Sequence, residues 1–118
     1  MEKIVERGIL YDFYGSLLTE HQQSIYEDAV LNDMSLSELA EEYGISRQGI
    51  HDLIKRCDKI LQEYEDKLHL VDKFEKIKTN LNEIDKCTNN IEAIVSDERL
   101  IGLCNEISNL KANILEEL

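Results

Sequence analysis

Apolar residues recur along the chain at steps of three and four residues, the spacing that places them on one face of an α-helix. The first amphipathic run covers residues 2–18. A second helix is predicted from Thr19, because Thr19 followed by Gln22 is the sequence signature of a capping box. Residues 31–34 predict a turn after it. The buried stripe expected for the second helix consists of Ile25, Tyr26, Ala29 and Val30.

A third, short helix is predicted from Ser35, with Glu38 closing a second capping box. It is expected to end at Gly44, since glycine readily takes the left-handed conformation that closes helices. The residues expected to face inward are Leu36, Leu39 and Ala40.

A fourth helix is predicted after Ser46, which suits an N-cap. Its apolar stripe continues to Ile84 with a mean spacing near 3.5 residues, as in a long helix that packs on a partner helix. Asparagines and Thr88 within residues 80–90 weaken helix propensity and predict a break or kink there. Ser96 is the expected cap of a last helix over residues 97–117. The sequence therefore predicts an all-α protein.

The third and fourth predicted helices have the layout of a helix-turn-helix. A small residue stands where the two helices cross, and a residue tolerant of positive φ follows four places later in the turn. Further apolar residues lock the second helix onto the first. The predicted motif core is Ala40, Gly44, Ile45, Ile50 and Leu53, completed by Leu36 and Leu39. A plain pair of short helices in a bundle is the alternative interpretation.

The outward face of the second motif helix carries the candidate DNA contacts. Arg47, Gln48 and His51 lie at or near its N-terminus, where such motifs reach base edges. Arginine pairs with guanine and glutamine with adenine in the major groove. Phosphate contacts are expected from Ser46, Lys55, Arg56 and Lys59. Asp52 lies near the same side, where it would repel phosphate or select cytosine.

The overall charge opposes this interpretation. The 118 residues include 25 acidic and 13 basic side chains, a formal charge of −12, whereas nucleic-acid-binding domains are usually basic. From Ser46 to Lys59, however, there are four basic and two acidic residues, so the segment is locally positive. Phosphate contacts supply most of the affinity for DNA, so a monomer with this footprint would bind weakly and a dimer would double it.

Two family resemblances follow from these residues. The run LLTEHQQSIYEDAVLNDMSLSELAEEYGISRQGIHDLIKRCDKIL, residues 17–61, resembles region 4 of bacterial sigma factors. The opening residues, about the first 75, more closely resemble the YlxM family of small helix-turn-helix proteins. The sigma resemblance implies a helix-turn-helix of the winged-helix type that lacks the wing. The YlxM resemblance implies a gene beside those of the signal recognition particle in Gram-positive bacteria, and a regulatory role in that protein-targeting pathway.

Other chemistry finds little support in the sequence. Cys57, Cys87 and Cys104 are widely spaced and odd in number, which argues against a disulfide framework and a zinc site and favours reduced, mostly buried thiols. No nucleophile–base arrangement or phosphate loop is present, so no enzyme, cofactor or metal is expected. No signal peptide or membrane span is apparent, and a cytoplasmic location is expected.

The sequence thus predicts two parts: a helix-turn-helix domain over residues 1–60 and a helical extension over residues 61–118. The extension is expected to form a hairpin that exposes an apolar strip to a second copy, which makes a homodimer. The predicted function is that of a DNA-binding regulator with duplex DNA as its partner. The alternative is an adaptor that binds RNA or protein of the signal recognition particle and uses the helix-turn-helix only as a scaffold.

Overall fold

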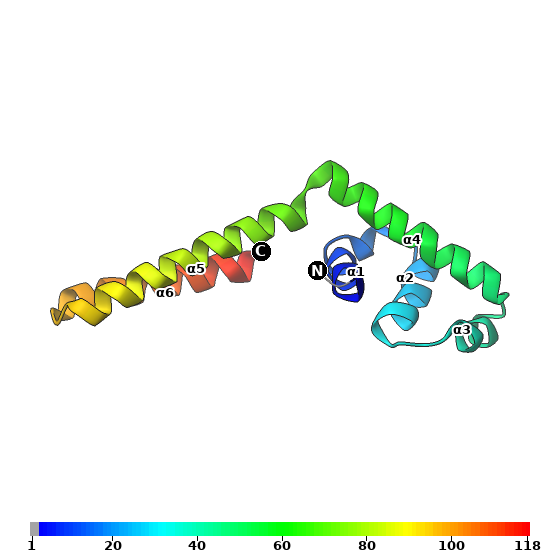
Figure 1. Ribbon diagram of the computed structural model, residues 1–118, viewed down its shortest axis with the longest axis horizontal. Helices are drawn as coiled ribbons and strands as arrows, with labels where there is room; N and C mark the ends of the chain where they lie inside the picture. The colour runs from blue at the N-terminus through cyan, green and yellow to red at the C-terminus, as the bar shows by residue number, and fades with distance from the viewer. Residues whose placement is uncertain (1–2) are drawn as a thin grey trace. The chain divides into compact units, whose positions relative to one another are not determined.

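The computed structural model describes residues 3–118, and every element within that range is helical (Figure 1). This confirms the all-α prediction; Glu2, where the first helix was expected to begin, lies outside the described residues. The elements are α1 (Lys3–Tyr14), the 3₁₀ helix η1 (Gly15–Leu17), α2 (Glu20–Tyr26), the π-helical turn η2 (Glu27–Leu31), α3 (Leu36–Tyr43), α4 (Arg47–Leu68), α5 (Leu70–Ile94) and α6 (Glu98–Glu117).

Both predicted capping boxes are present. The Gln22 backbone N–H donates to Thr19 Oγ1 at 3.2 Å, and Thr19 N–H donates to Gln22 Oε1 at 3.0 Å. Ser35 and Glu38 make the same reciprocal pair at 3.1 and 3.3 Å. These bonds satisfy N–H groups that a helix start leaves unpaired, which is why the local sequence fixes where α2 and α3 begin.

The turn between α2 and α3 is shorter than predicted, because residue 31 still belongs to η2. Asp28 organises this segment through its carboxylate and its backbone. Its carboxylate accepts hydrogen bonds from the Tyr43 hydroxyl at 2.6 Å and from Asn32 Nδ2 at 2.9 Å, and its carbonyl accepts from Met34 N–H at 3.0 Å. One aspartate therefore ties η2 to the far end of α3.

Two clusters of buried side chains hold α1, α2 and α3 against α4. The first contains Leu10, Tyr14, Leu18, Tyr26, Cys57 and Leu61. The second contains Ile25, Leu39 and Ile50. Leu53 and Ile54 pack against both clusters, so α4 is the element that the other three helices share. This is also how Figure 1 shows α4, which runs past α1, α2 and α3.

The long helix predicted after Ser46 ends at Leu68, and the prediction of a break within residues 80–90 is wrong. His69 takes the left-handed conformation, with φ 56° and ψ 31°. Tyr14 stabilises the chain here: its hydroxyl donates to Glu65 and accepts from Leu70 N–H at 3.1 Å. Glu65 Oε1 also accepts from Val71 N–H at 3.0 Å. A tertiary contact with α1 thus helps set the position of the break.

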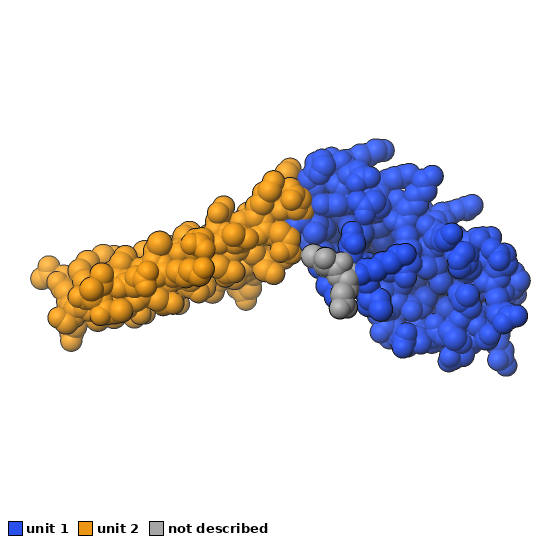
Figure 2. Space-filling model, viewed as in Figure 1, with its two compact units in different colours: residues 1–71 blue, residues 72–118 orange. Residues whose placement is uncertain are grey.

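The described chain divides into two compact units, residues 1–71 and 72–118 (Figure 2). The first unit includes the whole of α4, whereas the sequence placed a domain boundary at residue 60. Leu61 is fully buried in the first cluster, which explains why the helix cannot be divided there.

The second unit consists of most of α5 together with α6, which lie side by side in Figure 1. Asp85 of α5 forms an ion pair with Lys111 of α6, at 2.5 Å. The asparagine-rich stretch is helical throughout, since propensity is a weak preference that packing overrides. The cap of α6 is Asp97 and not Ser96, because the Asp97 carboxylate accepts from Arg99 N–H at 2.9 Å.

Candidate nucleic-acid interface

The turn between α3 and α4 depends on two glycines. Gly44 has φ +67°, the left-handed conformation predicted for it, and its N–H bonds to the Ala40 carbonyl. A Cβ on Gly49 would lie 2.7 Å from Ile45 Cγ2, closer than packed atoms approach. Gly49 therefore lets the turn pack closely on α4, a requirement that the sequence reasoning missed.

The motif core residues occupy different depths. Ile50 is fully buried, and Ala40, Ile45 and Leu53 are partly buried against the same packing. Leu39 is also fully buried, but the expectation that Leu36 faces inward is wrong, since Leu36 is 38% exposed. Leu36 is the first residue of α3, where the helix end projects beyond the core.

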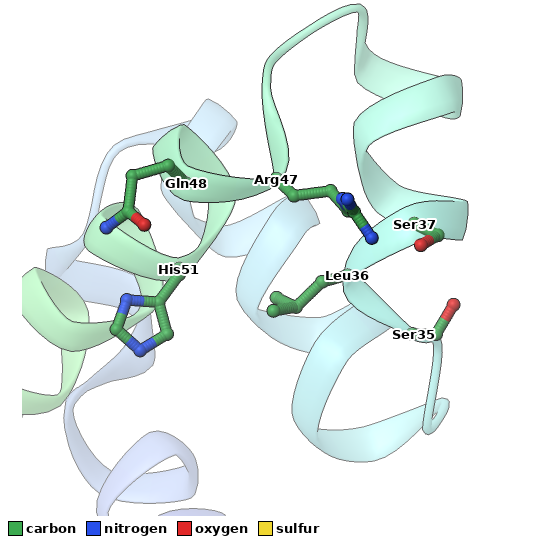
Figure 3. Close-up of a pocket in the computed structure, with 6 residues that line it drawn as sticks. All are labelled: Ser35, Leu36, Ser37, Arg47, Gln48 and His51. Atoms are coloured by element: carbon green, nitrogen blue, oxygen red, sulfur yellow. The ribbon is translucent and has the colours of Figure 1, made fainter.

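Leu36 instead lines a surface hollow with the three candidate base-contacting residues (Figure 3). Arg47, Gln48 and His51 come from the first turns of α4, and Ser35, Leu36 and Ser37 come from the start of α3. In Figure 3 the Arg47 side chain extends toward the start of α3. The predicted base-contacting residues are thus brought together on one accessible face.

Asp52 orients one of these side chains, Gln48, through a hydrogen bond and lies beside a second. Gln48 Nε2 donates to Asp52 Oδ1 at 2.9 Å, and His51 Nδ1 lies 3.6 Å from the same oxygen. Gln48 therefore keeps its carbonyl oxygen and a second N–H for other partners. The sequence predicted that Asp52 repels phosphate or selects cytosine, and the structure adds a hydrogen bond that positions Gln48.

The predicted phosphate-contacting residues lie on two flanks of α4. Lys55 and Lys59 line a second hollow together with Lys3 and Arg7 of α1. Arg56 lines a third hollow, with residues from the start of α2. The Ser46 hydroxyl accepts from Gly49 N–H at 3.0 Å as the N-cap of α4, which leaves its own hydrogen free to donate. The positive charge of α4 therefore spans its exposed face.

Arg7 is held firmly in place. Its Nη2 forms an ion pair with Asp58 Oδ2 at 2.6 Å, and the other oxygen of Asp58 accepts from the Tyr26 hydroxyl at 2.6 Å. Burial and this hydrogen bond raise the pKa of Tyr26, so the phenol stays protonated as the donor. The i, i+4 spacing of Lys3 and Arg7 was visible in the sequence, but nothing there placed them beside Lys55 and Lys59.

The other candidate chemistry can be located in the same way. Among residues 3–118, no cluster of histidine, cysteine or acidic side chains could hold a metal ion. Cys57 and Cys104 are buried and Cys87 is exposed, and all three are free thiols. Within the described range no helix has the length and apolarity needed to cross a membrane.

Comparison with known proteins gives consistent matches. Residues 1–101 match the model of the UPF0122 family, described as helix-turn-helix proteins, YlxM / p13 like. A UPF0122 protein of Shouchella clausii is 41% identical over 107 residues, covering 91% of this chain and 92% of that protein. Another, from Thermoanaerobacter sp. strain X514, is 46% identical over 110 residues, covering 93% and 91%. A third, from Halalkalibacterium halodurans, is 38% identical over 111 residues, covering 94% and 99%.

Proposed function

The chain belongs to the UPF0122 family of YlxM / p13-like helix-turn-helix proteins, and on that premise we propose that it is a DNA-binding regulatory protein. The first turns of α4 enter the major groove, where Arg47, Gln48 and His51 contact base edges. Ser46, Lys55, Arg56 and Lys59 contact phosphates on either side of the groove. The protein acts in the cytoplasm as a binding protein and not as an enzyme.

One observation carries this proposal: the three candidate base-contacting side chains converge in one hollow between the starts of α3 and α4. Arginine and glutamine are the side chains that form bidentate pairs with guanine and adenine, and each such pair contributes about 1 to 3 kcal/mol of discrimination. The cations that flank this hollow lie on both sides of the same helix. A helix inserted into a groove has a phosphate strand on each side, so this distribution suits a duplex.

A homodimer assembled through residues 61–118 is the second part of the proposal. In residues 72–118 the buried side chains are only Leu81, Thr88 and Cys104, too few for an independent core. An apolar seam on α6 stays exposed, with residues spaced three and four apart as in a coiled coil. The seam residues are Leu100, Leu103, Ile107, Leu110 and Ile114.

A second copy is the partner that fits this α6 seam. The seam is made of leucine and isoleucine alone, so two copies of it are complementary to each other, as a twofold interface requires. Pairing also doubles the small number of basic residues that can contact DNA, since a dimer presents two α4 helices to two half-sites. The apolar seam and the DNA-binding face thus contribute to one regulator.

An adaptor for the signal recognition particle is the second candidate, and the overall charge of −12 is the observation in its favour. A surface this acidic suits a basic protein partner better than it suits phosphate. In this alternative the helix-turn-helix serves as a scaffold, and no contact with bases is made.

Fluorescence-anisotropy titrations at low and moderate salt separate the two candidates. The probes are a labelled duplex from upstream of the protein's gene and the signal recognition particle RNA. We expect duplex binding that Arg47→Ala and Lys55→Ala together abolish and that Lys67→Ala, an exposed lysine in the last turn of α4, leaves unchanged. Absence of duplex binding at low salt would refute the DNA-binding proposal, and RNA binding would then favour the adaptor.

A further inference from the structure

We propose that the hollow between α1 and α4 is a second nucleic-acid site, which binds backbone phosphates of duplex DNA beyond the bases that α4 contacts. The inference rests on the proposed function and adds α1 to the interface. The hollow has a volume of about 380 Å³. Its basic lining residues are Lys3 and Arg7 from α1 and Lys55 and Lys59 from α4.

The charge gathered here is unusual for so acidic a protein. Four of the chain's 13 basic residues line this one hollow. Glu6 and Asp58 are its acidic residues, and Asp58 is already occupied by Arg7 and by the Tyr26 hydroxyl. Within residues 3–118, Lys3, Lys55 and Lys59 form no ion pair, so their charge is available to a ligand. The hollow therefore contains three lysines that form no ion pair within the described residues, and one carboxylate, Glu6, in the same condition.

The Asp58 contact also prepares Arg7 for an anionic ligand. The guanidinium has five N–H donors in a fixed fork, and only Nη2 donates to Asp58. Arg7 Nε is buried and has no acceptor in the described part of the chain, whereas the side chain as a whole is 29% exposed. Since Asp58 is held in turn by Tyr26, the guanidinium is anchored at low entropic cost, which favours a fixed phosphate contact.

The position along α4 favours duplex phosphates over a small free anion. Lys59 lies eleven residues after Gln48, a rise of roughly 16 Å along the helix axis. Arg47 and His51 at the first hollow, and Lys55 at the second, project from the same exposed side of α4. A duplex seated on the first turns of α4 therefore brings its backbone past this hollow.

Salt-dependent anisotropy with the duplex probe tests the site. Removing one phosphate contact lowers the slope of log K against log salt by about 0.9, equivalent to roughly eightfold weaker binding at 0.1 M salt. We expect Lys3→Gln to produce this change equally for the target duplex and for a scrambled duplex, because phosphates carry no sequence information. Lys67→Gln, an exposed lysine that does not line the hollow, is the matched control and should keep the wild-type slope.

A variant that binds DNA more tightly cannot be explained by misfolding, so it provides an independent test of the site. Glu6→Gln removes the uncommitted carboxylate of the hollow and should strengthen duplex binding several-fold, whereas Glu63→Gln, outside the hollow, should not. If Arg47→Ala abolishes binding but Lys3→Gln and Glu6→Gln leave affinity and slope unchanged, this inference is wrong and the proposed function stands. If both variants alter only RNA binding, the hollow does not serve duplex DNA. If the wild-type protein binds no duplex, both proposals fail.

Discussion

At the scale of single residues, Asp52 has two opposed effects on the proposed interface. Its charge repels phosphate, and its Oδ1 holds the Gln48 amide at 2.9 Å. An amide side chain has an oxygen end that accepts and an NH2 end that donates, and a fixed acceptor beside it decides which way the two ends are turned. The residue that weakens binding in general is thus the one that orders a base-contacting group.

We therefore expect Asp52→Ala to raise affinity for all duplexes and to lower discrimination at the base pair contacted by Gln48. The free energy that discriminates between bases at this position should fall by about 1 kcal/mol, a part of the 1 to 3 kcal/mol that a bidentate pair contributes. Anisotropy titrations of the target duplex and its single-base variants measure both effects. Asp66→Ala is the control, because Asp66 accepts from Gln62 with the same 2.9 Å geometry elsewhere on α4. Unchanged discrimination in Asp52→Ala would show that the Gln48 contact has no role in specificity.

Asp28 and Tyr43 give a prediction about pH. The hydrogen bond from Tyr43, followed by that from Asn32, lowers the pKa of Asp28 in the folded state. A carboxylate with a lowered pKa stabilises the fold at pH values above its unfolded pKa, and this contribution is lost as the pH falls through the folded pKa. The same contact raises the pKa of Tyr43 to about 12, so the phenol remains a donor at neutral pH.

Tyr43→Phe should accordingly lower the free energy of unfolding by about 1 kcal/mol at pH 7 and by less at pH 3, which is below the unfolded pKa of Asp28. Urea denaturation followed by circular dichroism at both pH values measures this. Tyr64→Phe removes a hydroxyl that makes no hydrogen bond within residues 3–118, so its effect should not depend on pH. An equal loss at both pH values for Tyr43→Phe would mean that Asp28 is not the acceptor in solution.

At the scale of elements, the break between α4 and α5 depends on one residue with a positive φ, His69. His69 has φ 56°, a conformation that costs a residue with a side chain roughly 1 to 2 kcal/mol and that glycine adopts freely. His69→Gly should therefore stabilise the protein, by about 1 kcal/mol. Lys67→Gly, within the last turn of α4, is the control and should destabilise by a similar amount. If His69→Gly is as destabilising as the control, α4 and α5 form one continuous helix in solution.

The same elements show which parts of the fold the sequence could specify. The starts of α2 and α3 and the end of α3 were predicted correctly, because their hydrogen bonds join residues within one turn of each other. The break at His69 was missed because Tyr14, more than fifty residues earlier, provides one of its hydrogen bonds. Lys3 and Arg7 were missed as site residues for the same reason: their neighbours on α4 are distant in sequence.

At the scale of the whole molecule, each compact unit contains one buried thiol that reports on its integrity. Cys57 is fully buried in the first cluster, and its burial raises the pKa of the thiol to about 11. Cys104 is only 3% exposed, yet it belongs to the unit with few other buried residues. The first unit has a core of its own. In the proposed dimer, the α5–α6 hairpin of the second unit opens only when the α6 seam is unpaired.

Thiol modification should therefore separate the two units. With a thiol-specific reagent at pH 8, Cys87 should react at once and Cys57 at a slow rate that is independent of protein concentration. Cys104 should react more slowly as the concentration rises, because dimerisation lowers the population of open hairpins by mass action. Peptide mass spectrometry after quenching assigns each rate to its cysteine.

Charge placed in the α6 seam supplies the decisive comparison. Leu103→Lys combined with Leu110→Lys puts two cations into the proposed contact and should make Cys104 reactive at every concentration, without a change at Cys57. Asn105→Lys combined with Ala112→Lys adds the same charge, at the same seven-residue spacing, to exposed positions outside the seam and should behave like wild type. A Cys104 rate that does not change with concentration in the wild-type protein would mean that the hairpin stays closed without a second copy. DNA binding would then have to rest on the cations of one subunit, and the salt slope would be correspondingly shallow.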